Sequence, residues 1–230
     1  MRKLIGILLI GMLTACNKVG VTETEVQAVQ SVLDFYGGEC NRHKGFSTTN
    51  NETETYFELE MSQSQLIESY AKILKLPASN IAYLFYSNLK DEQDNYTHVN
   101  VKINLSNGKS HEYSYKAQDL KEIENLIPFL QTASEKIKSQ DYKGLLSQFD
   151  KDISSNLSAT QLKTYCTSYD SAYGKIEMIQ FQGYDFFEGK EDNRPLVNLA
   201  GIMIRENNNT PFSLFIDRES RKIITMKYEF

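Results

Sequence analysis

The chain lacks several features that mark well-defined functions. It has no tryptophan, and only three cysteines and four prolines, in 230 residues. It contains no Gly-x-Ser-x-Gly elbow, no glycine-rich phosphate loop and no His-Glu-x-x-His helix. No run of lysine and arginine exceeds two residues, so the sequence offers no electrostatic basis for binding nucleic acid. We therefore expect no enzyme activity, no cofactor, no metal and no nucleic-acid partner.

The one long apolar run lies at the N terminus. Arg2 and Lys3 precede the apolar residues 4–12, and Leu13-Thr14-Ala15-Cys16 follows them. This order of basic, apolar and small residues is that of a secretory signal, and the run is too short to span a bilayer as a mature helix. We therefore predict that residues 1–15 are a signal peptide.

The four residues Leu13-Thr14-Ala15-Cys16 resemble the lipobox of bacterial lipoproteins. The resemblance implies that the Cys16 thiolate receives a diacylglycerol and that the chain is cut before it. Residues 16–21 then form a lipidated tether, which reaches only about 20 Å when fully extended. Asn17 is not the Asp that resembles an inner-membrane retention signal, so we expect an outer-membrane protein facing the periplasm if the bacterium has two membranes. An ordinary signal peptide cleaved after Ala15 is the alternative.

The net charge and the two remaining cysteines limit how the mature chain can contact a membrane and how it can be cross-linked. The whole chain carries a formal charge of −5, and losing Arg2 and Lys3 leaves −7. Anionic lipids repel such a chain, so acyl groups on Cys16 are expected to be its membrane contact. Cys40 and Cys166 can form one disulfide in an oxidising periplasm. The apolar helical face around Cys166 instead predicts a buried, unpaired thiol.

The first predicted domain covers residues 22–125 and mixes helices with strands. Thr22 and Glu25 form a capping box, so a helix is expected to begin there and to end at Gly37. The elements expected next are a polar loop over 39–54, a half-buried strand over 56–61, a helix over 62–76 that Pro77 ends, and a helix or a strand over 80–89.

A hairpin is expected between Tyr96 and Lys116. A three-residue loop at 106–108 sets the apolar face of the first strand opposite Tyr115, Tyr113 and His111, whereas a two-residue loop sets it opposite Lys116, Ser114, Glu112 and Ser110. We predict the longer loop, because register follows the buried face and Gly108 suits a left-handed position.

The second predicted domain covers residues 126–230. Pro128 is expected to interrupt a helix and to mark the domain boundary. Helices follow, the last capped by Ser158 and Gln161 and ended by Gly174. The four strand-like segments after them are 175–187, 195–206, 211–217 and 222–230. Helices followed by tightly linked strands predict an α+β fold, with an antiparallel sheet curled over helices.

The second domain resembles a known class of small secreted domains. The run from Gln140 to Leu146, Phe149, the helix start at Ser158 and Gly174 resemble cystatin-like and NTF2-like domains. The resemblance covers residues 128–230 and implies a cone-shaped sheet around a long helix. Because that class includes enzymes, ligand binders and inert modules, it implies a fold and a pocket rather than an activity.

Some residues are candidates for chemistry, each with a structural alternative. Cys40 and His43 have the Cys-x-x-His spacing, which is half of what a structural zinc site needs, or they form a Cys/His nucleophile pair; the structural alternative is a loop cysteine beside a solvated histidine. His98 and His111 lie on the other hairpin. Glu188, Glu191 and Asp192 suggest a calcium site or a solvated turn. Five aromatic residues either line a ligand cavity or are part of the hydrophobic core: Tyr165, Tyr169, Tyr173, Tyr184 and Phe186.

The sequence leaves two classes of function. The first is a lipid-anchored, non-catalytic envelope lipoprotein that binds another protein of the envelope. The second is a small-ligand binder, or an NTF2-like enzyme, that uses the interior of the second domain. A deep cavity at Tyr165 or Asp185 with a buried partner favours the second class, and a filled interior favours the first.

A Cys16→Ser variant should lose lipidation, because no thiolate remains to accept the diacylglycerol. The variant should stay as uncleaved precursor or become soluble. The reason is that the expected anchor is the acyl chains, each of whose buried methylene groups contributes about 0.8 kcal/mol to membrane binding. Mass spectrometry and membrane fractionation measure both results. A chain that starts at Asn17 and still pellets with protein-stripped membranes would contradict the prediction.

Overall fold

A computed structural model describes residues 20–49, 52–190 and 192–230, so the predicted signal peptide and Cys16 lie outside the described residues. The helices are α1 (Glu23–Tyr36), α2 (Gln65–Ser69), α3 (Lys75–Asn88), the 3-10 helix η1 (Lys90–Asn95), α4 (Ala117–Lys138), α5 (Tyr142–Leu146), α6 (Lys151–Asn156) and α7 (Ala159–Tyr173). The strands are β1 (Glu39–Thr49), β2 (Glu52–Ser62), β3 (His98–Asn104), β4 (Ser110–Lys116), β5 (Ile176–Glu188), β6 (Pro195–Arg205), β7 (Thr210–Asp217) and β8 (Ile223–Lys227).

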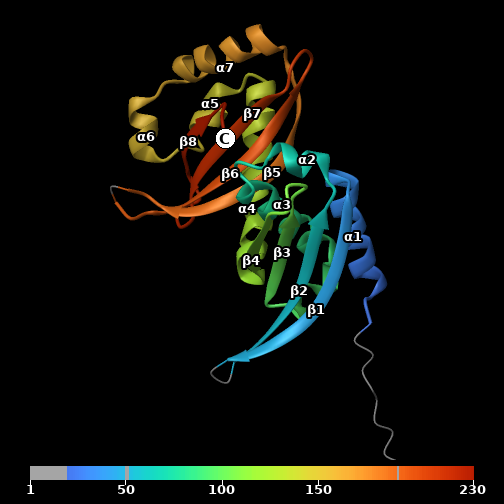
Figure 1. The fold of residues 1–230 in the computed structure, drawn as a ribbon. Helices are drawn as coiled ribbons and strands as arrows, with labels where there is room; N and C mark the ends of the chain where they lie inside the picture. Colours follow the sequence, from blue (N-terminus) through green and yellow to red (C-terminus); the bar gives the residue numbers. More distant parts are fainter. Residues whose placement is uncertain (1–19, 50–51, 191) are drawn as a thin grey trace, which may run out of the picture.

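The α+β class is confirmed, with two four-stranded sheets in the described part of the chain (Figure 1). Strands β1 to β4 form the first sheet in chain order, and β5 to β8 form the second in the same way. Within the described ranges, none of the helices has the length and hydropathy needed to cross a membrane.

The predicted first helix is confirmed, together with its cap. The Thr22 hydroxyl accepts a hydrogen bond from the Glu25 amide at 3.1 Å, and the Glu25 carboxylate accepts one from the Thr22 amide at 2.8 Å. The helix ends at Gly37, whose φ of 63° is a left-handed value that glycine adopts without steric cost.

The predicted loop over 39–54 is wrong, because this polar segment forms β1 and the start of β2. The two strands pair antiparallel from Glu39 opposite Ser62 to Thr49 opposite Glu52. β1 is an edge strand with one neighbour, so it buries few side chains and has no apolar alternation to reveal it.

The third and fourth strands confirm the predicted hairpin and its register. Val99, Val101 and Ile103 pair with Tyr115, Tyr113 and His111. The loop is the three-residue one, and Gly108 has a φ of 81°. β2 and β3 run parallel, so α2, α3 and η1 form the crossover between them.

Two helix boundaries attributed to proline are wrong. The segment over 62–76 contains only the short α2, and α3 begins at Lys75 with Pro77 in its first turn. A first-turn amide has no partner within the helix, so proline is tolerated there. The predicted helix after Asn80 is confirmed as the body of α3.

The predicted interruption at Pro128 is also wrong, because α4 continues through it. A proline inside a helix costs about 3 kcal/mol. The apolar face of α4 continues on both sides of the proline and is buried along its whole length: Leu120, Ile123, Leu126, Leu130, Ala133 and Ile137 are each at most 1% exposed. This packing outweighs the local cost, so the boundary expected near residue 126 falls inside a helix that contacts β4, β5 and β6.

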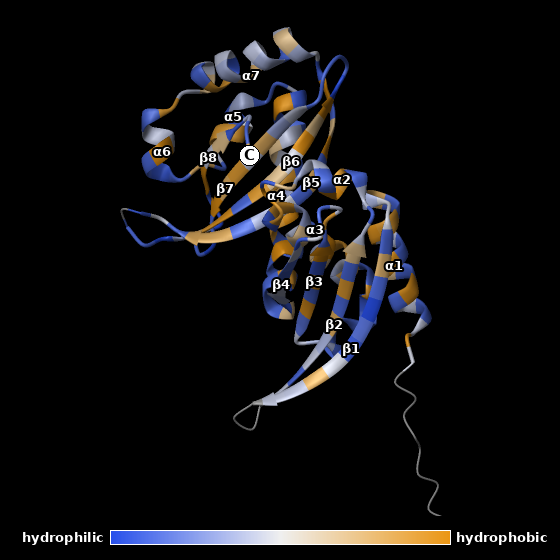
Figure 2. Ribbon diagram, in the orientation of Figure 1, coloured by the Kyte–Doolittle hydropathy of each residue, from blue (hydrophilic) through white to orange (hydrophobic). Residues whose placement is uncertain are grey.

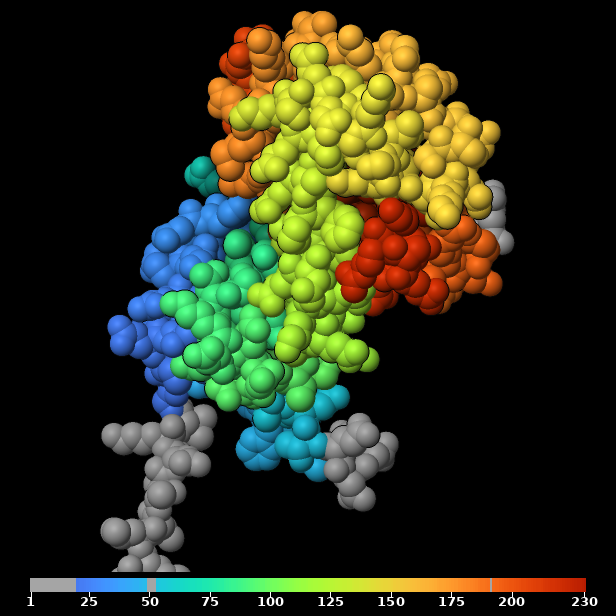
Figure 3. Space-filling model, turned by 180° about the vertical axis from the view of Figure 1, so that it is seen from behind, coloured from blue at the N-terminus to red at the C-terminus, as the bar shows by residue number. Residues whose placement is uncertain are grey.

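The antiparallel second sheet and its four strands are confirmed. The helix after Ser158 has the predicted capping box and ends at Gly174. Leu199, Leu214 and Ile216, which share one face of the sheet, are fully buried. Seen from behind, α4 runs along this side of the molecule and spans both halves (Figure 3).

The two halves meet where α3 packs on β5. The Tyr184 amide donates a hydrogen bond of 2.8 Å to the Ser79 hydroxyl, which donates to the Leu76 carbonyl. Gly183 lies at a bulge in β5 with a φ of 146°, and a side chain there would meet the backbone of Leu76. One continuous hydrophobic core therefore extends through both halves.

A buried polar cluster ties the start of the described chain to the first half. Glu25, 1% exposed, accepts hydrogen bonds from the Tyr96 hydroxyl and from Lys44 Nζ, the latter at 2.8 Å. Lys44 Nζ also donates to the Gly20 carbonyl at 3.1 Å. Burial raises the pKa of Glu25, but the hydrogen bonds from Lys44, Tyr96 and Thr22 outweigh it, so the pKa lies below its ordinary value.

A Gly183→Ala variant should lower the free energy of unfolding by about 2 to 3 kcal/mol, because its methyl group overlaps Leu76 and Ser79. The matched control is Gly108→Ala, where φ is also positive but nothing lies within 4 Å of the added carbon. It should cost only the backbone strain, about 1 kcal/mol. Urea unfolding measures both values, and equal losses would show that the contact with α3 is not tight.

A Glu25→Gln variant should lower the free energy of unfolding at neutral pH by about 2 kcal/mol or more, because it leaves Lys44 without its buried partner. The folded pKa of Glu25 is lowered, so its stabilising effect is present above the unfolded pKa of about 4.3 and is lost as pH falls through the folded pKa. The difference from wild type should therefore shrink as pH falls below about 4. Unfolding midpoints across pH measure this, with Glu23→Gln on the exposed side of α1 as the control.

Candidate functional site

The second sheet has one face that its helices leave uncovered. Helices α4, α5 and α7 lie behind the sheet in Figure 1, and the opposite face looks toward the viewer. On that face Asp185, Asn198 and Phe215 form a cross-strand row, and Phe187 packs edge-on against Phe215 with ring centroids 5.9 Å apart. Figure 2 shows that apolar segments continue along β6 and β7. Apolar side chains that stay exposed on a sheet face, as Phe187 does at 38%, are a feature of binding surfaces.

A groove of about 310 Å³ lies on this face, between the sheet and the connection from α2 to α3. We refer to it as the groove, and its lining residues are Ile73, Lys75, Leu76, Tyr184, Asp185, Asn198, Ala200 and Phe230. Ile73 and Phe230 are each 45% exposed, so two large apolar side chains meet solvent at its margin.

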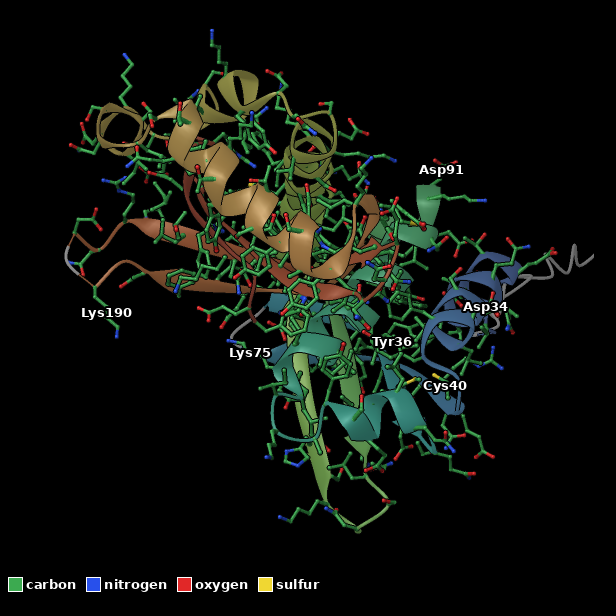
Figure 4. The ribbon with its side chains drawn as sticks, turned by 90° about the horizontal axis from the view of Figure 1, so that it is seen from above. Asp34, Tyr36, Cys40, Lys75, Asp91 and Lys190 are labelled. Carbon is green, nitrogen blue, oxygen red and sulfur yellow. The ribbon has the colours of Figure 1, made fainter. Side chains whose placement is uncertain are left out.

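The polar groups of the groove differ in how they are paired. Lys75 Nζ and Asp185 Oδ1 form an ion pair at the rim, and both side chains are more than 40% exposed, so solvent screens the pair. Figure 4 shows Lys75 beside the strands of the second sheet. Tyr184 Oη has no hydrogen-bond partner in the described part of the chain, but Tyr184 pairs with Leu199, so its side chain lies on the helix-covered face of the sheet. On the groove side, Asn198 Oδ1 is buried and also has no partner there. Such a group costs about 1 to 3 kcal/mol, so a bound donor would relieve it.

The α3–β5 junction forms the groove. α3 begins at Lys75, so Ile73 just before it and Leu76 in its first turn lie on the groove side. Gly183 allows Leu76 to reach the backbone of β5 directly. The apolar wall from the first half thus lies against strands of the second half, which no local sequence pattern could place together.

In the described part of the chain, two larger clefts lack the unpartnered buried side-chain atom that the groove has. One, of about 620 Å³, includes Asp170, which holds the fully buried Arg205 side chain at 2.7 Å. Lys138 in the same cleft donates to the Glu177 carbonyl at 2.7 Å. The other, of about 710 Å³, lies beside η1 and the start of α4.

The structure separates Cys40 from His43. They are three residues apart on β1, so they lie on opposite faces of the sheet, and His43 Nε2 lies 3.7 Å from a Glu60 oxygen. His98 and His111 lie on different strands of the first sheet. In residues 20–49, 52–190 and 192–230, no three His, Cys, Asp or Glu side chains converge as a metal site would require.

Cys40 and Cys166 are both free thiols. Cys166 is fully buried in α7, as predicted. Burial raises the pKa of each thiol to about 11, so both are protonated at neutral pH and are poor nucleophiles.

The five aromatic residues proposed to line one cavity form two separate groups. Tyr169 stacks on Tyr228 with ring centroids 3.7 Å apart, and Tyr165 and Tyr173 pack beside Tyr169. Tyr184 instead packs against Phe186, and Tyr184 lines the groove. Tyr165 lines a different cavity, of about 220 Å³, between α6, α7 and β8.

The acidic turn after β5 is held by an arginine. Arg194 Nε lies 2.9 Å from Asp192 and 3.6 Å from Asp217, so these carboxylates already have a cationic partner. Glu188 ends β5 and is exposed, whereas Glu191 lies outside the described residues.

The groove has one signal in the sequence that local analysis did not use. Asn198 is the single polar side chain in the ten residues 195–204 of β6. A strand with one solvated face alternates between apolar and polar, whereas a continuous apolar run indicates that both faces are apolar. The second apolar face of β6 is the floor of the groove.

Comparisons with known proteins add no relative: the chain matches no protein-family model, no curated protein and no solved structure.

Proposed function

We propose that the chain is a lipid-anchored envelope lipoprotein that acts as a non-catalytic protein-interaction module, with the groove as its docking site. The observation that carries the proposal is the groove on the face of the second sheet that α4, α5 and α7 do not cover, with exposed apolar side chains at its margin and the buried, unpartnered Asn198 Oδ1 in its lining. The anchor is the lipid on Cys16, and the expected location is the outer membrane, facing the periplasm, in a bacterium with two membranes.

The extent of the apolar face favours a protein partner. It continues beyond the groove through Phe187 and Phe215, and Met178 near the other end of β5 is 57% exposed. A small molecule fills only the groove, whereas a protein segment covers the whole row. Interfaces of this kind combine an apolar centre with a polar rim, as Lys75 and Asp185 provide here.

The absence of catalysis is supported by the interior of the second half. Leu162, Leu199, Leu214 and Phe212 fill the space between the helices and the sheet and are at most 3% exposed. Both described thiols are protonated at neutral pH. The one-sided helix cover of the sheet is also consistent with a cystatin-like or NTF2-like fold, in which case the docking site lies outside the cone.

A small-ligand binder is the second candidate, because the groove itself has the volume of a small-molecule site. Its occupant would place an apolar body against Ile73 and Phe230 and donate a hydrogen bond to Asn198 Oδ1. Native mass spectrometry of a chain that starts at Asn17, purified without detergent, would reveal such a ligand as a constant added mass.

A photo-crosslinking amino acid in place of Lys75, at the groove rim, should capture one partner of constant mass in intact cells. The matched control is Lys190, also an exposed lysine, at the tip of the β5–β6 hairpin (Figure 4). An added Ile73→Glu change should reduce the adduct by about tenfold, because it places a charge in the apolar contact. Immunoblots measure the yields. Equal adducts from both positions, or an adduct that Ile73→Glu leaves unchanged, would contradict docking at the groove.

A further inference from the structure

The β1–β2 hairpin extends beyond the rest of the first sheet. β2 pairs with β3 only from Tyr56 onward, so the pairs from Ser47–Glu54 to Thr49–Glu52 have no third strand beside them. At about 3.3 Å per residue this overhang is about 10 Å long. We refer to residues 46–49 and 52–55 as the distal hairpin. Thr55 is still hydrogen-bonded to Thr97, but the pairs beyond it form a two-stranded ribbon, which is at best marginally stable in water and would gain order from a surface beside it.

Phe46 lies at the base of the distal hairpin and is 75% exposed, the highest value among the large apolar side chains of the described residues. It is the only strongly apolar residue between Asn41 and Thr55. Figure 2 accordingly shows a single apolar band in this part of the hairpin. The distal hairpin therefore offers one aromatic side chain to whatever it meets, and the rest of it consists of serine, threonines and the two glutamates Glu52 and Glu54.

The start of the described chain is fastened beside this hairpin. Lys44, two residues before Phe46, binds the Gly20 carbonyl and the Glu25 carboxylate. In Figure 1 the start of α1 and the distal hairpin lie at the same end of the molecule. Gly20, the first residue that the structure describes, is therefore held next to Lys44.

The length of the tether brings the distal hairpin to the lipid. Four residue steps separate Gly20 from Cys16, which is at most about 14 Å of chain. The hairpin reaches a similar distance, because Thr49 is five residues beyond Lys44 along an extended strand. A fully extended tether that runs alongside the hairpin would place Cys16 at the level of the distal hairpin, so that both meet the same membrane surface.

We propose that Phe46 and the distal hairpin form a second contact with the membrane, whose occupant is the boundary between headgroups and acyl chains of a lipid surface. Aromatic side chains are favoured at this boundary. The proposal rests on the proposed anchor at Cys16. A single phenylalanine is too weak to hold a soluble protein on a membrane, but the tether raises its effective concentration at the surface. The contact thus orients an anchored protein without anchoring it.

The absence of tryptophan from the chain allows a direct test. In the acylated protein with a Phe46→Trp change, the single tryptophan should shift its emission to shorter wavelength in phosphatidylcholine vesicles. Lipids brominated in the acyl chain should quench it. The matched control is Phe187→Trp on the second sheet, also an exposed phenylalanine, where neither the shift nor the quenching is expected.

The mass of the purified protein is measured first, so that the anchor and the hairpin are tested separately. Quenching of tryptophan at 46 but not at 187, in protein of acylated mass, supports the proposal. Acylated protein without quenching at 46 overturns the hairpin contact and leaves the anchor intact. Protein without acyl mass overturns both. Equal quenching at both positions shows that the protein has no fixed orientation and also overturns the contact.

Discussion

The contact between α3 and β5 is the constraint on which the rest of the structure depends. At Gly183 the strand bulges and carries no side chain, so the carbonyl of Leu76 approaches its backbone directly. The Ser79 hydroxyl then links the two elements, accepting from the Tyr184 amide and donating to Leu76. Because one residue satisfies groups on both elements, this junction has a defined geometry as well as buried area. The groove and the shared core are both consequences of it.

Local signals in the sequence predicted the elements that local interactions determine. Both capping boxes, at Thr22 and at Ser158, are present, and so is the three-residue loop at Gly108. Each depends on residues within a few positions of one another, and on hydrogen bonds or a backbone angle that particular side chains require. The four strands of the second sheet were also predicted, because their apolar content and short polar links are visible along the chain.

The errors occur where tertiary contacts decide. Pro128 would break an isolated helix, but the buried face of α4 spans two sheets, and this packing exceeds the cost of the proline. The hairpin from Glu39 has no apolar pattern, because an edge strand is stabilised mainly by pairing with its neighbour. The groove joins Ile73 to Asn198, more than a hundred residues apart, and periodicity within one segment carries no information on such a pair.

The same packing connects the proposed membrane contact in the first half with the proposed docking site at the groove. If the halves were joined by a flexible linker, the position of the first half on a membrane would say nothing about the groove. Here α4 contacts strands of both sheets and α3 contacts β5, so the halves share one core. The cluster of Glu25 and Lys44 fixes where the chain leaves the first half. An anchor at Cys16 with a second contact at Phe46 would therefore set the direction in which the groove faces. The protein would then present its docking site to the periplasm at a fixed orientation, with no moving part between the membrane and the partner.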